Sequence, residues 1–349
     1  MPPSTQELEG FTCWLLDVRA LWPGGKIQDA AADVLELLSP EERETCLRKM
    51  FIADARMSLG SALLKRLFIS RSLGIPWKQV KIARKGDPTH GKPAALSPDG
   101  SFAPIDFNVS HQAGLVALVG CRTGQAREQT TDGLTQVGVD IVCVNERDDY
   151  RTIDQEGFDG WIDIYEEVFS EEERWDMKFK IDSLTLLDGR TLTGEQIGRN
   201  DRCVHRHRDL TVRLPSGQTE TFTSDILIDA KLRRFYTFFC YKEAYIKLAG
   251  EALLAPWLKQ LEFHNVKSPE PGTVARCSTH GVWGEKVDDV EVSLHGKTVS
   301  DVRMSIQAFE ESFMIATAVR GPSLSQLPSF TGLHLEHDIL PYTTKEYAL

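Results

Sequence analysis

The sequence predicts an α+β fold with mostly antiparallel sheets, built as two related α/β halves that join near residue 135. In each half a long helical pattern precedes a set of strands, at 54–68 before 105–120 and at 238–250 before 261–319. Runs of helix followed by runs of strand are typical of the α+β class. The helix-start pattern Ser-x-x-Glu also occurs twice, at Ser39 and at Ser170, upstream of each long helix. This weak internal similarity indicates a duplicated plan.

The first half is expected to span residues 1–135. At Ser39-Pro40-Glu41-Glu42, serine is a helix N-cap, proline suits the first helical position and the glutamate closes a capping box. An amphipathic helix is predicted at 54–68. The runs 105–110 and 115–120 flank the turn HQAG and predict a β-hairpin.

The second half is expected to span residues 136–320, beginning with the β-branched strand 136–144. In the helix 238–250, large apolar residues recur at helical spacing and Gly250 is the expected C-cap. Strands are predicted at 261–266, 289–295, 302–309 and 313–319. The polar, turn-rich segment at about 182–228 is predicted to be an insertion or a mobile loop, and 321–349 a tail across the body.

Composition excludes several classes of protein. The chain has 349 residues, 41% of them hydrophobic, which suffices for a buried core. Its net charge of −11 argues against a nucleic-acid binder but leaves room for a small anionic ligand. We find no apolar run long enough to span a membrane and no secretory signal, so a cytoplasmic location is expected. The seven cysteines are scattered, and Cys203-Val-His205-Arg-His207 lacks a second ligand pair for zinc.

Two acidic residues lie in apolar surroundings. Asp140 interrupts the strand VGVDIVCV, and Glu243 lies between Lys242 and Lys247 in an aromatic helix. A buried carboxylate is costly unless a cation compensates it. Carboxylates from separate elements are the ligands that Mg²⁺ takes, together with substrate phosphates. The alternatives are that Asp140 caps a turn or ends at an edge, and that Glu243 and Lys247 form an ordinary surface ion pair.

A basic segment at 81–93 and the pair Ser110-His111 are candidate phosphate ligands. The segment has cations within a Gly- and Pro-containing stretch, which predicts a loop. Ser110 and His111 lie at the end of a predicted strand, where both could donate to phosphate oxygens. A solvated turn and a surface histidine are the alternatives. Neither GxxxxGK[ST] nor GxGxxG occurs, so a diphosphate–metal site of another type is predicted.

The motifs and their order along the chain resemble those of the Sfp-type 4′-phosphopantetheinyl transferases, most of all their large fungal members. The matching segments are Ser39-Pro40-Glu41, Asp54-Ala55-Arg56, Gly91-Lys92-Pro93, Asn108-Val-Ser110-His111, Val137-Gly138-Val139-Asp140 and Phe239-Cys240-Tyr241-Lys242-Glu243-Ala244-Tyr245-x-Lys247. The resemblance covers about residues 35–320 without 182–228. One motif alone is weak, whereas the ordered set is highly specific.

The resemblance implies two pseudo-symmetric halves with coenzyme A (CoA) in the cleft between them. It implies transfer of the 4′-phosphopantetheine arm of CoA to a serine of an acyl or peptidyl carrier protein, with release of adenosine 3′,5′-bisphosphate. Asp140 and Glu243 match Mg²⁺ ligands, and catalytic roles are implied for Glu243, Lys247 and His111. The general base is either Glu243 or a metal-bound water. The implied CoA-binding residues are Arg56 at the 3′-phosphate, Arg84, Lys92, Pro93, Ser110, His111, Lys242 and Lys247.

The resemblance also implies partners and one departure. Fungal relatives tend to serve polyketide synthases, nonribosomal peptide synthetases and aminoadipate reductase in lysine synthesis. Val142 stands where many bacterial members have a third metal carboxylate. We expect a monomer, because two halves in one chain can form the cleft alone. The rival hypotheses are a Mg²⁺-dependent nucleotide phosphohydrolase and a non-catalytic CoA-binding scaffold.

Overall fold

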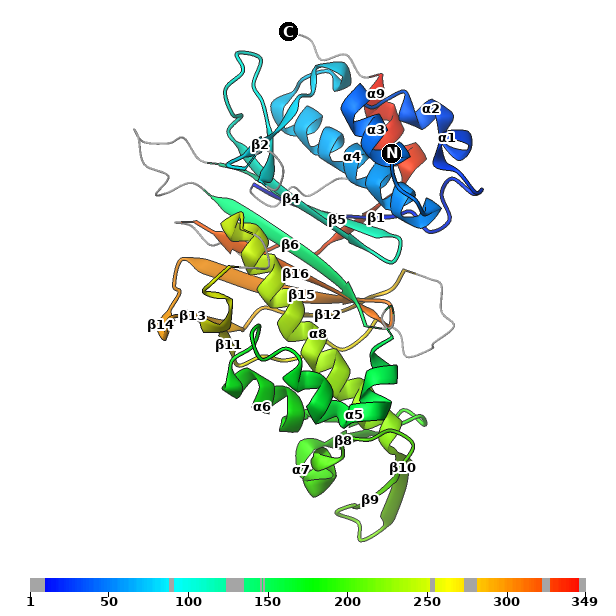
Figure 1. Cartoon of the computed structure of the whole chain (residues 1–349), viewed down its shortest axis with the longest axis vertical. Coiled ribbons are helices and arrows are strands. Elements are labelled where there is room, and N and C mark those ends of the chain that lie inside the picture. The colour runs from blue at the N-terminus through cyan, green and yellow to red at the C-terminus, as the bar shows by residue number, and fades with distance from the viewer. Residues whose placement is uncertain are drawn as a thin grey trace.

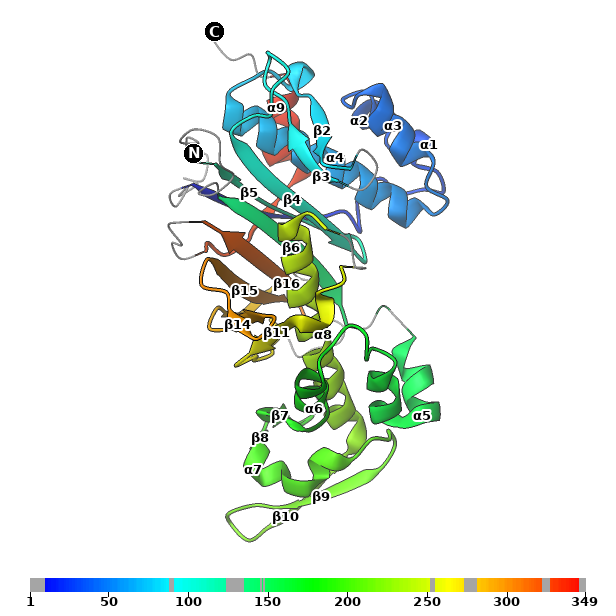
Figure 2. The ribbon, with the colours of Figure 1, turned by 60° about the vertical axis from the view of Figure 1, so that its left-hand side comes forward.

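The structure is a computed structural model that describes residues 10–87, 91–123, 135–144, 146, 148–251, 255–272, 281–321 and 327–344. It contains both helices and strands, as the sequence predicts, and two four-stranded sheets form its centre. Figures 1 and 2 show α4 beside one sheet and α8 beside the other. In both views, β6 lies between β4 of the first sheet and β16 of the second.

The first sheet has the strand order β17-β1-β5-β4. The predicted hairpin is confirmed, because β4 and β5 pair antiparallel around Ala113 and Gly114. The helix predicted at 54–68 is also confirmed and is longer. The elements of this part are β1 (Phe11–Asp17), α1 (Ile27–Ala30), α2 (Ala32–Leu35), α3 (Pro40–Leu47), α4 (Ile52–Leu73), β4 (Ile105–Gln112) and β5 (Leu115–Arg122).

The second sheet has the order β12-β15-β16-β6, and all of its pairs are antiparallel. α8 packs on β6 and β16, and Gly250 ends it in the left-handed conformation, as predicted. β11, β13 and β14 form a small separate sheet. The elements are β6 (Gln136–Cys143), α5 (Asp149–Asp163), α6 (Glu171–Phe179), α8 (Ser224–Ala249), β11 (Leu261–His264), β12 (Trp283–Val287), β13 (Glu291–Leu294), β14 (Lys297–Thr298), β15 (Val302–Phe309) and β16 (Phe313–Arg320).

The main body has four layers in the order helix, sheet, sheet, helix, and three apolar cores lie between them. One lies between α4 and the first sheet, and another lies under α8, α5 and α6. The third lies between the two sheets and joins β1 and β5 to β6 and β16. Residues of β6 therefore alternate between the two cores that flank it: Val139 and Ile141 face the first sheet, whereas Val142 packs on the α8 side.

Both predicted capping boxes are present. Ser39 and Ser170 each accept a hydrogen bond from the backbone N–H three residues on, and Glu42 and Glu173 bond back to the serine N–H. The two bonds satisfy N–H groups that have no partner within a helix start.

The structure of the basic segment 81–93 differs from the loop predicted there. It is not a loop: β2 (Ile82–Lys85) and β3 (Lys92–Ala95) pair as an antiparallel hairpin. Gly91 is required at its position, because a Cβ there would collide with the Lys85 and Asp87 carbonyl oxygens. Residues 88–90, between the strands, lie outside the described part of the chain.

The segment 182–228 is folded, so the mobile-loop alternative is wrong, while its origin as an insertion stays a prediction. It has its own apolar core, which includes Leu184, Leu192, Val212 and Phe222. Figure 1 shows this module at the opposite end of the molecule from α4. Its elements are β7 (Ser183–Thr185), β8 (Thr191–Thr193), α7 (Gly194–Ile197), β9 (Asp209–Arg213) and β10 (Thr219–Thr223).

The described part of the tail returns to the first sheet. β17 (Thr331–Leu333) pairs parallel with β1, and α9 (Leu340–Thr343) follows a π-helical turn at Leu335–Ile339. Leu335 and Ile339 are buried in the core beneath α4. The Arg71 guanidinium lies 5.2 Å from the Trp14 ring centroid and 5.3 Å from that of Tyr342, so it links the tail to α4.

The edges of the two sheets meet along a line that we call the seam. Three side chains of β4, Asp106, Asn108 and Ser110, accept hydrogen bonds from backbone N–H groups of β6. Each donor lies 31 residues after its acceptor, so the two strands run parallel. The seam ends at Ser110, where the candidate site begins.

Candidate active site

The centre of the site is a three-way contact between β4, β6 and α8. The Lys247 Nζ donates to Asp140 Oδ1 at 2.6 Å and to Ser110 Oγ at 2.8 Å. The Ser110 hydroxyl donates to the same carboxylate oxygen at 2.9 Å. Asp140 is only 6% exposed, so the Lys247 ammonium compensates a carboxylate that has left water. Lys247 therefore reaches across from α8 to β6, and Asp140 is buried on the edge strand of its sheet.

The packing of α8 on β6 brings these groups together. Gly138 allows it, because a Cβ there would collide with the Ala244 carbonyl oxygen and with the backbone of Leu248. The Cys240 Sγ lies 3.4 Å from the backbone oxygen of Asp140, about two turns before Lys247. The helix therefore lies directly on the strand at this point.

Glu243 belongs to the same charged group. The pKa of the Cys240 thiol lies well above its usual range, mainly because the thiol is buried and next because of the Asp140 charge. Glu243 also raises this pKa, while Lys247 lowers it. The two carboxylates and the ammonium thus all lie close enough to act on one thiol. Glu243 is 9% exposed, at the edge of the core.

His111 lies on the other face of β4, where it is exposed. Its pKa lies below the usual value, first because the ring is partly removed from water and then because of the Lys247 and Lys49 charges. Lys65 of α4 contributes in the same direction. Positive charge thus surrounds His111 from α8, from α4 and from the loop before α4.

Lys49 and Lys65 are candidate site residues that the sequence reasoning missed. Burial lowers the pKa of the Lys65 ammonium. The Glu42 carboxylate acts against this shift, and the Arg84 guanidinium of β2 adds to it. Arg84 also donates to the Gly91 carbonyl oxygen at 2.7 Å, which braces the hairpin. Lys65 lies nine residues after Arg56 and so on the opposite face of α4, and only the fold shows that it lies near Arg84 and His111.

Lys242 does not join this group. Its ammonium is buried on the opposite side of α8, 2.9 Å from Glu173 Oε2, and donates to the Leu258 and Leu261 carbonyl oxygens. Burial lowers the pKa of Lys242 and raises that of Glu173. The predicted CoA contact of Lys242 is therefore not supported by its position, and the residue holds α6 and β11 against α8.

Lys92, Pro93 and Arg56 occupy structural positions near the site. The Lys92 Nζ is ion-paired with Asp106 and donates to the Val137 carbonyl oxygen, so it clamps the start of the seam. Pro93 pairs with Arg84 in the β2–β3 hairpin. The Arg56 guanidinium donates to the Trp22 carbonyl oxygen at 3.0 Å from Nη2. These contacts leave their predicted CoA roles as predictions.

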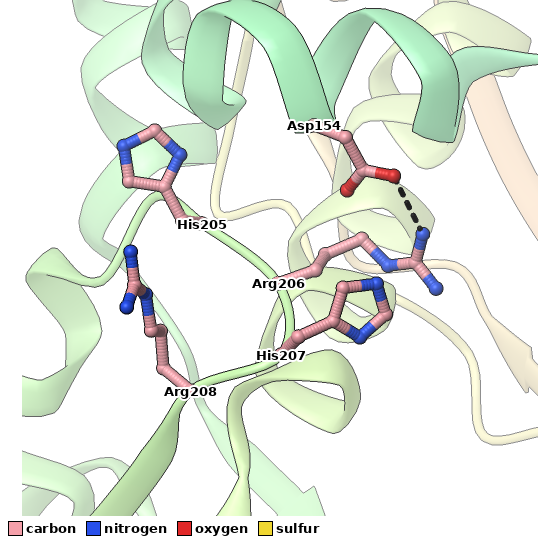
Figure 3. Close-up of a pocket in the computed structure, with 5 residues that line it drawn as sticks. All are labelled: Asp154, His205, Arg206, His207 and Arg208. Carbon is pink, nitrogen blue, oxygen red and sulfur yellow. Dashed lines mark hydrogen bonds and ion pairs between the residues drawn. The ribbon is translucent and has the colours of Figure 1, made fainter.

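A cavity of about 540 Å³ lies in the module at the far end of α8, away from this centre. Figure 3 shows Asp154, His205, Arg206, His207 and Arg208 around it. Arg206 pairs with Asp154 at 3.3 Å, and the His207 ring lies 3.3 Å from Asp225. The acidic partners offset much of the positive charge. Within the described residues, no group of three or more His, Cys, Asp or Glu side chains could hold a metal ion.

The central site fits Mg²⁺ only through two carboxylates. Asp140 and Glu243 come from neighbouring elements and supply the oxygen donors that Mg²⁺ prefers. Val142 adds an apolar side chain to the core in place of a third carboxylate. A Mg²⁺ ion held by these two carboxylates would take its other oxygen ligands from water and from a phosphate.

Comparisons with known proteins show which family the chain resembles. Residues 26–123 match the family model of the N-terminal part of 4′-phosphopantetheinyl transferases. The chain is 70% identical over 337 residues to a 4′-phosphopantetheinyl transferase of Aureobasidium melanogenum, covering 97% of this chain and 98% of the relative. It is 36% identical to 4′-phosphopantetheinyl transferase A of Aspergillus fumigatus, covering 91% and 85%.

A shorter match reaches an animal protein. The chain is 31% identical over 107 residues to the L-aminoadipate-semialdehyde dehydrogenase-phosphopantetheinyl transferase of Mus musculus, with 30% of each chain covered. Separately, every helix in the described residues is too short or too polar to cross a membrane. The near full-length identity to named transferases, together with the ordered motifs, shows that this chain belongs to the family of 4′-phosphopantetheinyl transferases.

Proposed function

We propose that this chain transfers the 4′-phosphopantetheine group of CoA to a serine of an apo carrier protein. The observation that carries the proposal is the contact of Lys247 with Asp140 and Ser110, where the two sheets and α8 meet. These residues come from three of the motifs that define the resemblance. We further propose that each sheet with its long helix is one half of a pseudo-symmetric pair, and that CoA lies between the halves.

Positive side chains favour the phosphate groups of CoA at this place. Lys247, Lys49 and Lys65 all act on His111, and Arg84 acts on Lys65. Such a group is notable in a chain with net charge −11. Cations that converge on a partly dry region bind phosphate more strongly than cations scattered on a surface. We assign the diphosphate to Lys247, Ser110 and His111, and we keep Arg56 as the ligand of the 3′-phosphate.

Asp140 and Glu243 would hold Mg²⁺, which supplies neutralisation of the diphosphate charge when bound. The Lys247 ammonium lies against Asp140 at 2.6 Å. The same ammonium, 28% exposed, can also face an arriving phosphate. We infer that Lys247 exchanges part of its contact with Asp140 for the ligand when CoA binds.

The reaction needs positioning and charge neutralisation more than covalent help from the protein. The carrier serine Oγ attacks the phosphorus that bears the pantetheine arm. A new Ser–O–P bond forms as the P–O bond to the adenosine side breaks. Adenosine 3′,5′-bisphosphate leaves, and Lys247 and His111 offset its charge. The serine proton passes to Glu243 or to a water molecule.

We propose acyl and peptidyl carrier domains as the protein substrates. They include those of polyketide synthases, of nonribosomal peptide synthetases and of aminoadipate reductase. The name of the mouse relative, which refers to L-aminoadipate-semialdehyde dehydrogenase, supports the last of these. The monomeric state and the cytoplasmic location stay predictions.

The experiment incubates the purified chain with CoA, Mg²⁺ and an apo carrier domain and weighs the carrier by mass spectrometry. The proposal expects a mass increase of one phosphopantetheine on the carrier, and none when the carrier serine is replaced by alanine. Release of phosphate without carrier modification would support the phosphohydrolase alternative. CoA binding without any reaction would support a scaffold.

A further inference from the structure

The seam poses a problem that backbone pairing does not solve. β6 is the last strand of its sheet and pairs with β16 on one edge only. Its other edge faces β4, and the N–H groups of Val137, Val139 and Ile141 lie within buried residues. Unsatisfied buried N–H groups cost about 1–3 kcal/mol each, so this edge needs acceptors.

The polar row of β4 supplies these acceptors. Asp106 Oδ2 accepts from the Val137 N–H at 2.9 Å, Asn108 Oδ1 from Val139 at 3.1 Å, and Ser110 Oγ from Ile141 at 3.4 Å. The three side chains are only 4%, 6% and 6% exposed. They replace the backbone carbonyls of a missing neighbouring strand.

The seam also joins the two parts of the candidate site. Its last acceptor, Ser110, contacts Asp140 and Lys247 directly, and Asp140 lies between the donors Val139 and Ile141 on β6. At the other end, Lys92 binds both Asp106 and the Val137 carbonyl oxygen. Asn108 therefore accepts the middle hydrogen bond of the seam, between the Lys92 contacts at one end and the candidate site at the other.

We propose that Asn108 is a positioning residue: by accepting the Val139 N–H it fixes the distance between Ser110 on the first sheet and Asp140 on the second. The inference rests on the proposed function, because the groups it positions are those assigned to CoA and the metal. Asn108 itself touches neither Asp140 nor Lys247 in the contacts described here, so its effect must pass through the strands. A misplacement of about 1 Å in such a site can cost roughly 100-fold in rate.

The test compares three variants. Asn108→Val removes the acceptor and keeps a strand-forming side chain. Asn108→Ser retains an oxygen like the one that Ser110 uses at its own rung of the seam. Val109→Ala, on the opposite face of the same strand, is the matched control, because it loosens the core beneath α4 without touching the seam. For each we measure thermal stability, hydrogen exchange of the Val139 amide, and kcat and KM with saturating carrier, well below the melting temperature.

We expect Asn108→Val to lose roughly 10- to 100-fold in kcat and to exchange the Val139 amide faster. Asn108→Ser should recover most of both effects. Val109→Ala should lower stability and leave kcat close to that of the wild type. If Asn108→Val does not fold, Asn108→Ala takes its place with the same expectation.

A kcat of Asn108→Val or Asn108→Ala that equals the wild-type value would overturn the inference, as would a loss that Asn108→Ser does not recover. Failure of the proposed function gives a different result: the wild type itself would not modify the carrier.

Discussion

The buried pair of Lys242 and Glu173 allows a direct test of what Lys242 does. The two side chains are 2% and 3% exposed and lie 2.9 Å apart. Replacing Lys242 by methionine keeps the unbranched apolar part of the side chain but leaves the Glu173 carboxylate buried without its cation. Removing one partner of such a pair costs about 3–5 kcal/mol.

The hydrogen bonds around this pair narrow the expected loss of stability. Glu173 keeps two backbone donors, Ser170 N–H and Phe263 N–H, each at 3.1 Å, which offset part of the loss. The Leu258 and Leu261 carbonyl oxygens lose the ammonium that they accept from, which adds to it. We therefore expect Lys242→Met to lower the free energy of unfolding by about 3–4 kcal/mol, while the Kd for CoA stays close to that of the wild type.

A second variant checks the reason for the loss. Adding Glu173→Gln removes the uncompensated charge and retains an acceptor oxygen for one of the two backbone donors, Ser170 N–H and Phe263 N–H, which bind different oxygens of the carboxylate. The double variant should therefore be more stable than Lys242→Met alone, by about 1–2 kcal/mol. Without this coupling, the effect would come from packing and not from charge.

The pH dependence has a definite sign. Burial raises the pKa of Glu173, so the folded state favours the protonated carboxyl. Stability from such a group is present at low pH and is lost as the pH rises through the folded-state pKa. Without Lys242 this effect is larger, so the difference in stability between Lys242→Met and the wild type should shrink as the pH falls from about 8 to about 5.

Urea denaturation followed by circular dichroism measures the stabilities, and calorimetric titration measures CoA binding. The reasoning is refuted if Lys242→Met unfolds at the wild-type urea concentration and binds CoA more than about tenfold more weakly. That outcome would restore the CoA contact predicted from sequence.

Four other predictions follow from the site and the fold. Asp140→Asn and Glu243→Gln should each abolish carrier modification with unchanged circular dichroism, and near-normal turnover at ordinary Mg²⁺ would contradict the metal assignment. Because burial and the neighbouring lysines hold the pKa of His111 below its usual value, the ring gains charge only in acid. CoA affinity should therefore rise as the pH falls from about 7 to about 5, and His111→Gln should remove this rise, as titration calorimetry can show. Val142→Glu should tighten Mg²⁺ binding without CoA, at a cost in stability because the site is buried, and calorimetry with and without CoA would detect no gain if the side chain cannot reach the metal. Replacing residues 184–222 by a short Gly/Ser linker should leave CoA binding intact, because loop closure depends weakly on length; unfolding of that variant would make the module part of the core.

Periodicity explains what the sequence predicted well. α4, α8 and the strands of both sheets carry regular apolar patterns, and the two capping boxes mark helix starts by local chemistry alone. β1 and the β2–β3 hairpin were missed. The hairpin contains Gly and Pro at positions that a tight pair of strands tolerates, so local composition favoured a loop there.

The two lysines of α8 show why the site was harder to predict than the fold. Lys242 and Lys247 both lie in a buried helix within a recognised motif, and sequence spacing places them on different faces without saying which face meets β6. Packing decides it. Gly138 lets the helix approach on the side of Lys247, and Lys242 is left facing Glu173. One lysine becomes a candidate ligand of the substrate and the other a structural cation.

The polar row of β4 could not be interpreted correctly without the second sheet. Alternation of Asp106, Asn108 and Ser110 with apolar residues is the pattern of a strand with one face in water. All three side chains are buried instead, because the face they form covers the open edge of β6. This has a consequence for the site. The Ser110 hydroxyl accepts a hydrogen bond from the β6 backbone and also donates one to Asp140. The same hydroxyl therefore belongs both to the seam and to the candidate site. Any change that increases the distance between β4 and β6 along the seam must therefore move Ser110 away from Asp140. The spacing of the two sheets is thereby coupled to the chemistry of the site.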